Sequence, residues 1–458
     1  TFPNLKRLDL SFSRKLIRIP DLYRLSPNIE EILLHGCKRL TEVSSSGFLN
    51  KLNCLHLDRC YELRSLTILS NILWRSSGSI NLSFCSKLQM FPIPTITSGR
   101  DNGTASESKG ILSRVKGTFD PVVNIGRHEK QECWLDLSYC KSVTSHSFEF
   151  DLSKLKFLKK LLLNCCYNLE TFPEIEDTME NLAELNLCGT AIRALPSSLC
   201  RLVALQKLNL FGCTKLETIP SSIGNLSNLC ELHLAYCKSL ETFPSSIFKL
   251  KLTDLNLIGC SKLRTFPEIL EPAQTFAHVN LTATAIKELP SSFGNLVHLQ
   301  TLRLKECTHL ESLPNSIVNL NLLSVLDCSG CTKLTHIPSG IGHLSSLESL
   351  DLSECEKLEC IPRLPSFLKQ LKTFDCHTRV MSNSLIQIPS NSKKGGIFRF
   401  YFANGQQLDP GAHANIVDEA RLRMTGDAYR SVFFLFPGSE VPHWFPFRGE
   451  GHSITINT

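Results

Sequence analysis

The residues of this sequence that could do chemistry most directly are its cysteines, of which there are 20 among 458 residues. Regularly spaced thiols can form disulfides, bind zinc or act as nucleophiles. Most of them, however, fall on the ninth position of a repeated pattern, L-x-x-L-x-L-x-x-C. From Cys166 to Cys355 that position recurs only at steps of 23 or 24 residues. Below it is called the ladder position, and it is occupied by Cys37, Cys60, Cys85, Cys140, Cys166, Thr190, Cys213, Cys237, Cys260, Thr284, Cys307, Cys331 and Cys355, with Ser13 and Cys376 in the first and last units.

The repeated pattern predicts the elements that must position these thiols. In each unit, L-x-L is a short strand whose two leucines face inward while the residues beside them face outward. Repeats of this length stack, so that neighbouring strands pair in parallel. The pattern resembles the leucine-rich repeat, whose consensus has Asn or Cys at the ninth position. The predicted fold is therefore an α/β solenoid with one parallel sheet on its concave face, over residues 1–378.

We interpret the ladder position as structural. Its side chain points into the bend after the strand, where a small buried residue with a weak donor is favoured, and a threonine hydroxyl can also donate. Disulfides between adjacent thiols and a metal site at Cys328 and Cys331 are the rival interpretations. Free buried thiols suit a reducing compartment better. The sequence gives no catalytic, cofactor-binding or metal-binding candidate.

Three stretches depart from the repeat. Residues 95–131 lose the leucine rhythm and are predicted to be an irregular insertion, and residues 379–397 a linker. Residues 398–458 contain alternating aromatic segments, which favour β-structure. The chain begins within a repeat and ends within a predicted strand, so we expect a fragment.

Composition and motifs argue against several functions. The net charge of +6 is below the level typical of nucleic-acid-binding domains, and no apolar run reaches 18 residues, so neither nucleic acid nor membrane is an expected partner. The sequence has no G-x-x-x-x-G-K-[ST], G-x-S-x-G or H-E-x-x-H motif. The chain is thus expected to bind a partner and not to be an enzyme.

The segments "FPGSEVPHWF" (436–445), "FANGQQLD" (402–409) and "GTAIRALPSSL" (189–199) carry a family resemblance. They resemble the repeats and the post-repeat jelly-roll domain of plant TIR-type nucleotide-binding leucine-rich-repeat disease-resistance proteins. Gly405 stands where that family usually has Cys. The resemblance implies a partial β-rich jelly-roll domain at 398–458. It also implies a cytoplasmic or nuclear immune receptor that senses a pathogen effector or a guarded host protein and is autoinhibited through its own nucleotide-binding domain.

Outward positions beside the inner leucines would form the protein-binding face. Exposed aromatic and arginine side chains dominate interface energies. The candidates are Phe12, His56, Arg59, Phe84, Tyr139, Phe211, His233, Tyr236, Arg303 and Lys305. Recurring asparagines between the leucines, such as Asn186, Asn256 and Asn280, are predicted to stack across strands through hydrogen bonds.

Two other functions remain open at this stage. An extracellular repeat receptor or enzyme inhibitor is favoured by the N-x-[ST] sequons at Asn81, Asn102, Asn225 and Asn280, although Asn81 and Asn280 lie within predicted strands. A truncated or decayed resistance-gene product is the other.

Overall fold

The computed structural model describes residues 2–68, 78–88, 133–145, 152–365, 367–376, 379–380, 396–401, 418, 421 and 429–435. The chain divides into two compact units, residues 1–208 and 209–458, so the division falls within the repeats. The predicted insertion at 95–131, most of the linker at 379–397 and the segment 436–458 lie outside the described residues.

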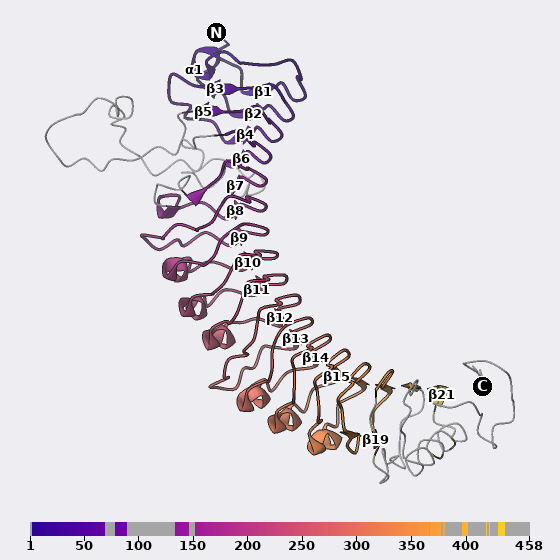
Figure 1. Cartoon of the computed structure of the whole chain (residues 1–458). Helices are drawn as coiled ribbons and strands as arrows, with labels where there is room; N and C mark the ends of the chain where they lie inside the picture. Colours follow the sequence, from indigo (N-terminus) through magenta and orange to yellow (C-terminus); the bar gives the residue numbers. More distant parts are fainter. Residues whose placement is uncertain are drawn as a thin grey trace, which may run out of the picture. The chain divides into compact units, whose positions relative to one another are not determined.

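Unit 1 is built on a parallel sheet of three-residue strands, one from each repeat (Figure 1). The central residue of each strand from β2 onward is buried and its two neighbours are partly exposed, which is the alternation that L-x-L predicts. In order along the sheet, the strands are β1 (Arg7–Asp9), β2 (Glu31–Leu33), β4 (Cys54–His56), β6 (Ser79–Asn81), β7 (Trp134–Asp136), β8 (Lys160–Leu162) and β9 (Glu184–Asn186).

Smaller elements cover the other side of unit 1. The short helix α1 (Leu22–Leu25) begins after Asp21, whose carboxylate accepts a hydrogen bond from the Arg24 amide. Strands β3 (Glu42–Ser44) and β5 (Ser65–Thr67) form a second parallel pair. The single-turn 3₁₀ helices η3 (Leu152–Lys154) and η4 (Ser197–Arg201) follow.

Unit 2 repeats the same plan. Its strands are β11 (Glu231–His233), β12 (Asp254–Asn256), β13 (His278–Asn280), β14 (Thr301–Arg303), β15 (Val325–Asp327), β16 (Ser349–Asp351) and β18 (Gln370–Lys372), each paired in parallel with the next. Strand β10 (Lys207–Asn209) falls on the boundary between the units. A parallel sheet of leucine-rich repeats is thus present in each unit, and the predicted solenoid class is confirmed.

The outer side of unit 2 consists of 3₁₀ helices that each start directly after a proline (Figure 1). Proline has no amide hydrogen to lose at such a start, and each helix buries one Ile or Phe. They are η5 (Ser221–Asn225), η6 (Ser245–Lys249), η7 (Ser291–Asn295), η8 (Asn315–Asn319) and η9 (Ser339–His343). A minor parallel pair, β17 (Cys360–Ile361) and β19 (Arg379–Val380), lies near the end of the repeats.

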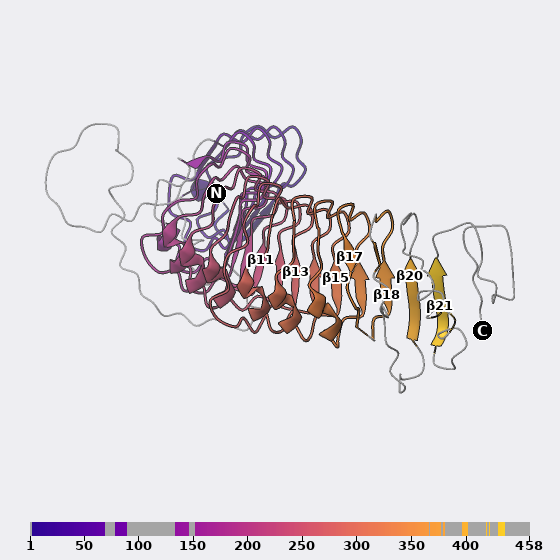
Figure 2. The ribbon, with the colours of Figure 1, turned by 60° about the horizontal axis from the view of Figure 1, so that its bottom comes forward.

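The tail contains β-structure as the sequence predicts, but its strands pair differently from those of an antiparallel jelly roll. β20 (Gly396–Tyr401) pairs in parallel with β18, and β21 (Tyr429–Leu435) pairs in parallel with β20 (Figure 2). The Thr373 amide donates to the Tyr401 carbonyl at 2.9 Å, and the Phe374 and Tyr401 rings lie 5.3 Å apart. β20 therefore continues the sheet of the repeats, because its register with β18 is that of another repeat strand.

Five phenylalanines form one cluster inside unit 2, between the strands and the outer helices. They are Phe243, Phe248, Phe266, Phe276 and Phe293, and neighbouring ring centroids lie 5.2–6.3 Å apart, mostly edge to face. Phe276 and Phe293 have no solvent exposure. The cluster joins successive repeats through their outer segments.

Replacing Phe276 by Ala should lower the free energy of unfolding by about 3–5 kcal/mol, because it leaves a cavity where a fully buried side chain stood. The control is Phe211→Ala, since Phe211 is 44% exposed and its truncation should cost less than about 1 kcal/mol. Urea denaturation followed by circular dichroism measures both. Equal losses for the two variants would contradict this account of the core.

Candidate protein-binding surface

Each strand ends in a tight turn whose last residue before the ladder position has a left-handed backbone. We call this residue the turn residue. Its φ lies between 53° and 74° in every repeat for which the structure gives a value. The turn residues are Phe12, Gly36, Arg59, Phe84, Tyr139, Cys165, Gly189, Gly212, Tyr236, Gly259, Ala283, Glu306, Gly330, Glu354 and Asp375. Ten of them are not glycine, although a side chain in this conformation costs roughly 1 kcal/mol.

The turn residue extends the pairing of the repeats beyond the strands. Its amide donates to a carbonyl of the following repeat: Arg59 to Ser83 at 2.8 Å, and Tyr236 to Ile258 at 2.7 Å. The left-handed conformation lets the amide of the turn residue make this hydrogen bond, although the chain bends inward at the next residue. The side chain of the turn residue is thereby directed outward, at the edge of the sheet.

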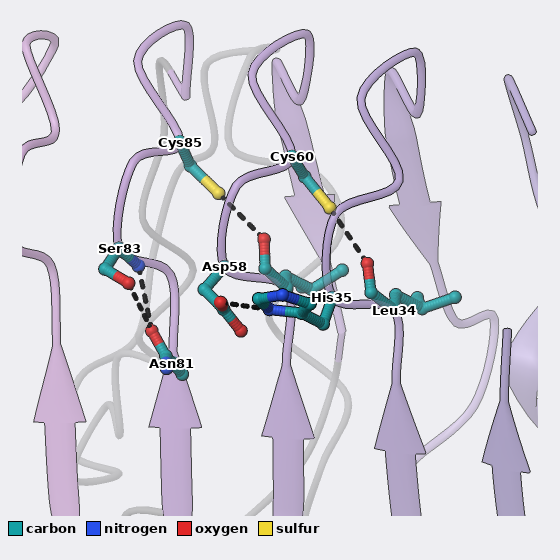
Figure 3. A network of polar contacts seen from close by, with 8 residues as sticks. Leu34, His35, Asp58, Cys60, Asn81, Ser83 and Cys85 are labelled. Carbon is teal, nitrogen blue, oxygen red and sulfur yellow. Dashed lines mark hydrogen bonds and ion pairs between the residues drawn. The ribbon is translucent and has the colours of Figure 1, made fainter. Parts of the chain in front are cut away.

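The ladder residues fill the inside of the same bend. The Cys60 thiol donates to the Leu34 carbonyl of the preceding repeat at 3.2 Å, and the Cys85 thiol donates to the Leu57 carbonyl at 3.2 Å (Figure 3). The Leu34 carbonyl also accepts the Cys37 amide at 3.2 Å. Equivalent thiol bonds are made by Cys37, Cys140, Cys166, Cys237, Cys260, Cys307, Cys331, Cys355 and Cys376.

The side chains at the remaining ladder positions make other contacts inside the bend. The Thr190 hydroxyl donates to the Leu187 carbonyl of its own repeat at 2.8 Å, and the Thr284 hydroxyl lies 3.4 Å from the Cys307 sulfur. Cys213 is buried, whereas Ser13 in the first unit is half-buried. All 20 cysteines of the chain are reduced. Burial raises the pKa of the Cys60, Cys166 and Cys260 thiols to about 12.

The asparagines between the leucines do not bond as predicted. The Oδ1 atoms of Asn186, Asn256 and Asn280 each accept the amide two residues further along the same chain, at 3.0–3.1 Å. Asn81 accepts both the amide and the hydroxyl of Ser83 (Figure 3). These contacts are Asx turns that start the bend, so the predicted hydrogen-bonded stack across strands is wrong for these side chains.

The structure separates the ten predicted binding residues into two groups. Only His56, His233 and Arg303 lie in strands. The others lie past the strand ends: Phe211 and Lys305 begin the bend, and Phe12, Arg59, Phe84, Tyr139 and Tyr236 are turn residues. The strands are too short for both groups, because each ends after three residues and the left-handed residue follows three positions further on. The candidate surface thus consists of a strand face and a turn edge.

On the turn edge of unit 1, three turn residues from successive repeats contact one another. The Phe84 and Tyr139 rings are stacked, with centroids 4.3 Å apart and planes 5° from parallel. The Arg59 guanidinium lies 5.9 Å from the centroid of the Phe84 ring, within the range of a cation–π contact. Phe12 lies apart from them and contacts His35, whose Nδ1 is paired with the Asp58 carboxylate (Figure 3).

The strand face of unit 1 holds a tryptophan that the sequence analysis did not single out. Trp134 of β7 lies 5.5 Å from His56 of β4, ring to ring, across the small Ser79 of β6. Burial lowers the pKa of the His56 imidazole, against the opposing effect of the Asp58 carboxylate. Leu33 and Leu162 occupy outward strand positions of the same sheet. The sequence signal that could have identified Trp134 is an aromatic residue directly before the inner leucine Leu135.

In unit 2 the turn edge is built around Tyr236. Its ring lies edge to face against Phe211, with centroids 5.4 Å apart. A Cβ placed on Gly259, the turn residue of the next repeat, would lie 2.6 Å from the Tyr236 ring. Tyr236 nevertheless remains 42% exposed, and His233 and Arg303 are exposed on the strand face. A large turn residue thus lies over a glycine in the following turn, with half of its ring free for a partner.

Neither a metal centre nor a membrane span is found in the part of the chain that the structure describes. No group of three or more His, Cys, Asp or Glu side chains is placed there to hold a metal ion. Among the same residues, no helix has the length and apolar character needed to cross a bilayer.

Comparison with known proteins identifies the repeats. A family model described as a leucine-rich repeat region matches residues 255–388, and a model of the leucine-rich repeats of RPS4B-like disease resistance proteins matches residues 154–248. Disease resistance protein RPS6 of Arabidopsis thaliana is 29% identical over 243 residues, 46% of this chain and 21% of RPS6. TMV resistance protein N of Nicotiana glutinosa is 30% identical over 201 residues, 44% of this chain and 16% of that protein.

The chain therefore spans about a fifth of the length of these curated relatives. Among solved structures, the leucine-rich repeat domain of the type III effector XopL is 23% identical, covers 52% of this chain and 76% of that domain, and superposes with a TM-score of 0.37. The repeats of this chain are related to the leucine-rich repeats of plant disease resistance proteins.

Native thiol titration should separate the buried cysteines, which include all ladder thiols, from the exposed and half-buried ones. Fourteen of the 20 cysteines are buried, five are half-buried and Cys230 is exposed. Burial raises the pKa of thiols such as Cys60 and Cys260 to about 12, which leaves almost no thiolate at pH 8, and burial also shields a thiol from reagent. The buried thiols should therefore not react with a thiol-specific disulfide reagent until the chain is denatured. In denaturant, all 20 should titrate. Rapid reaction of more than six thiols in the folded chain would contradict the ladder.

Replacing Gly259 by Ala should destabilise unit 2 by more than replacing Gly212 by Ala. Both residues have a left-handed backbone, which costs about 1 kcal/mol for Ala, but only the new Cβ at Gly259 meets the Tyr236 ring. The excess should disappear when Gly259→Ala is combined with Tyr236→Ala. A double-mutant cycle from urea denaturation measures the coupling, and strictly additive effects would exclude the contact.

Proposed function

We propose that this chain, whose repeats are related to those of plant disease resistance proteins, is the part of an intracellular immune receptor that recognises a pathogen effector. The strand face and turn edge bind either the effector itself or a host protein that the receptor guards. In a full-length receptor the same repeats also hold its nucleotide-binding domain in an inactive state. The chain itself binds and does not catalyse, and it acts in the cytoplasm or the nucleus.

The observation that carries this proposal is a set of partly exposed aromatic and basic side chains whose backbone is fixed by the hydrogen bonds of the repeats. Tyr236, Phe211 and Tyr139 are 38–44% exposed, yet each is fixed at a turn whose amides and ladder residue are bonded. Aromatic and arginine side chains dominate the energy of protein interfaces, and prior fixation reduces the entropy lost on binding. The arrangement is thus suited to a protein partner.

The contacts of the sequons and thiols weigh against an extracellular role. Asn81 and Asn280 are half-buried strand residues whose Oδ1 atoms are fixed by hydrogen bonds within their own turns, so a glycan on Nδ2 would disturb the bend. Asn102 lies outside the described residues. A ladder of reduced thiols favours a reducing compartment, which supports the intracellular proposal.

The test is to co-express the chain in leaf cells with each member of a pathogen effector library and capture the complexes. For the effector that binds, Tyr236→Ala and Arg303→Ala should each weaken binding at least tenfold, about 1.4 kcal/mol, without changing thermal stability. Lys249→Ala, on outer helix η6 of the same unit, is the matched control for Arg303→Ala and should leave binding unchanged. Wild-type affinity in both Tyr236→Ala and Arg303→Ala would refute this surface.

A further inference from the structure

The turn edge of unit 1 carries an excess of positive charge. We define this edge as the stretch from the strand end through the turn in the first five repeats, residues 11–18, 35–42, 58–65, 83–88 and 138–145. These described segments contain nine Lys or Arg, all exposed, against three Asp or Glu. The equivalent segments of unit 2, eight residues from each repeat over residues 211–360, contain eight Lys or Arg and eight Asp or Glu. The frame is the same, so the charge belongs to this edge and not to the repeat.

Most of these cations have no ion-pair partner among the residues that the structure describes. Within the described part of the chain, the edge has one lysine ion pair, Lys87 with Glu62 at 2.7 Å. The Asp58 carboxylate is paired with His35 and not with a Lys or Arg of the edge. The strand face of the same unit differs, since there Lys6 pairs with Glu30, Arg7 with Glu31 and Lys160 with Glu184. The cations of the edge are thus left available for carboxylates from outside the chain.

Aromatic rings hold some of these cations in place. Lys38 Nζ lies 5.9 Å from the centroid of the Tyr61 ring, and the Arg59 guanidinium lies at the same distance from that of Phe84. A cation lying over a ring keeps its remaining N–H groups free for an acceptor. The rings also provide exposed apolar surface beside the charges, because Phe12, Tyr61 and Tyr139 are 37–63% exposed.

The same contacts argue against nucleic acid as the ligand. Single strands bind aromatic side chains by stacking bases on open ring faces. Here Phe84 is stacked on Tyr139 on one side and has Arg59 near its ring, while Tyr61 has Lys38 near its ring. Carboxylates at the tips of flexible side chains can reach the cations without needing a ring face.

We propose that the turn edge of unit 1 binds an acidic, extended segment of a partner protein, with Arg39, Arg59 and Lys141 receiving its carboxylates. Neighbouring parallel strands lie about 4.8 Å apart, so five repeats span roughly 19 Å, the length of about six extended residues. This inference rests on the proposed function and deepens it, because it assigns a partner chemistry to one part of the same surface. Charge-assisted hydrogen bonds supply affinity, and the rings accept the apolar stems of the partner's side chains.

The probe is a fluorescein-labelled peptide of ten glutamates, and binding is followed by fluorescence anisotropy at 50 and 150 mM NaCl. The test variant is Lys15→Glu with Arg39→Glu, two exposed cations at the same position of repeats 1 and 2. Lys262→Glu with Lys333→Glu is the matched control, because it makes the same charge change at the same position of two repeats in unit 2. Circular dichroism checks that both variants fold as wild type does.

The test variant should weaken peptide binding at least tenfold, the control no more than twofold, and the wild-type affinity should fall as salt rises. Equal losses in both variants, or no binding at 50 mM NaCl, would overturn the proposal. So would tighter wild-type binding of a ten-residue oligothymidylate than of the peptide, which would indicate a nucleic-acid site. Because this assay contains no effector, its failure leaves effector recognition standing, and failure of the effector test leaves the acidic-peptide result standing.

Discussion

The carbonyl of the inward residue directly after each strand, usually a leucine, is the group on which the rest of the structure depends. It leaves the ladder at the bend and faces the interior, where an unsatisfied carbonyl costs free energy. At Leu34 it accepts the amide of Cys37 and the thiol of Cys60, one bond from its own repeat and one from the next. Each repeat is thereby tied to its neighbour inside the sheet as well as through it. A small, weakly donating side chain fits this place in repeat after repeat.

The same bend decides what the surface can present. To turn inward immediately after a three-residue strand, the chain adopts a left-handed conformation at one residue, and this conformation directs that side chain outward. Tyr236 and Phe12 occupy such places, and in both cases the next turn residue is a glycine, over which the ring lies. Two interactions offset the free-energy cost of the left-handed backbone: the hydrogen bond from the amide of the turn residue to the next repeat, and the packing of the ring. A rigid, half-exposed ring is the result, which is a form suited to recognition.

The two units differ mainly in what they place on this common frame. Their strands, bends and ladders follow one plan, whereas the charged side chains of the turn edge are strongly unbalanced in the first five repeats and balanced in unit 2. Ion pairs neutralise the strand face of unit 1 but leave most of the edge cations unmatched. Because the frame needs only the inward leucines and the ladder residues, the outward positions are free to vary with the partner.

The period of the leucines alone determined the repeats, the parallel sheet and the inward direction of residues such as Leu55 and Leu302, because a strand alternates its faces and equivalent leucines must stack. It also placed Cys60 and its equivalents together at the bend. Only the tertiary structure decided that Cys60 bonds to the preceding repeat, that Asn256 caps its own turn, and that Trp134 reaches His56 across Ser79. It also decided that, among the described residues, only Lys87 of the turn-edge cations of unit 1 forms an ion pair. These facts depend on backbone torsions and on side chains more than 20 residues apart meeting in space, and a hydrophobic period encodes neither.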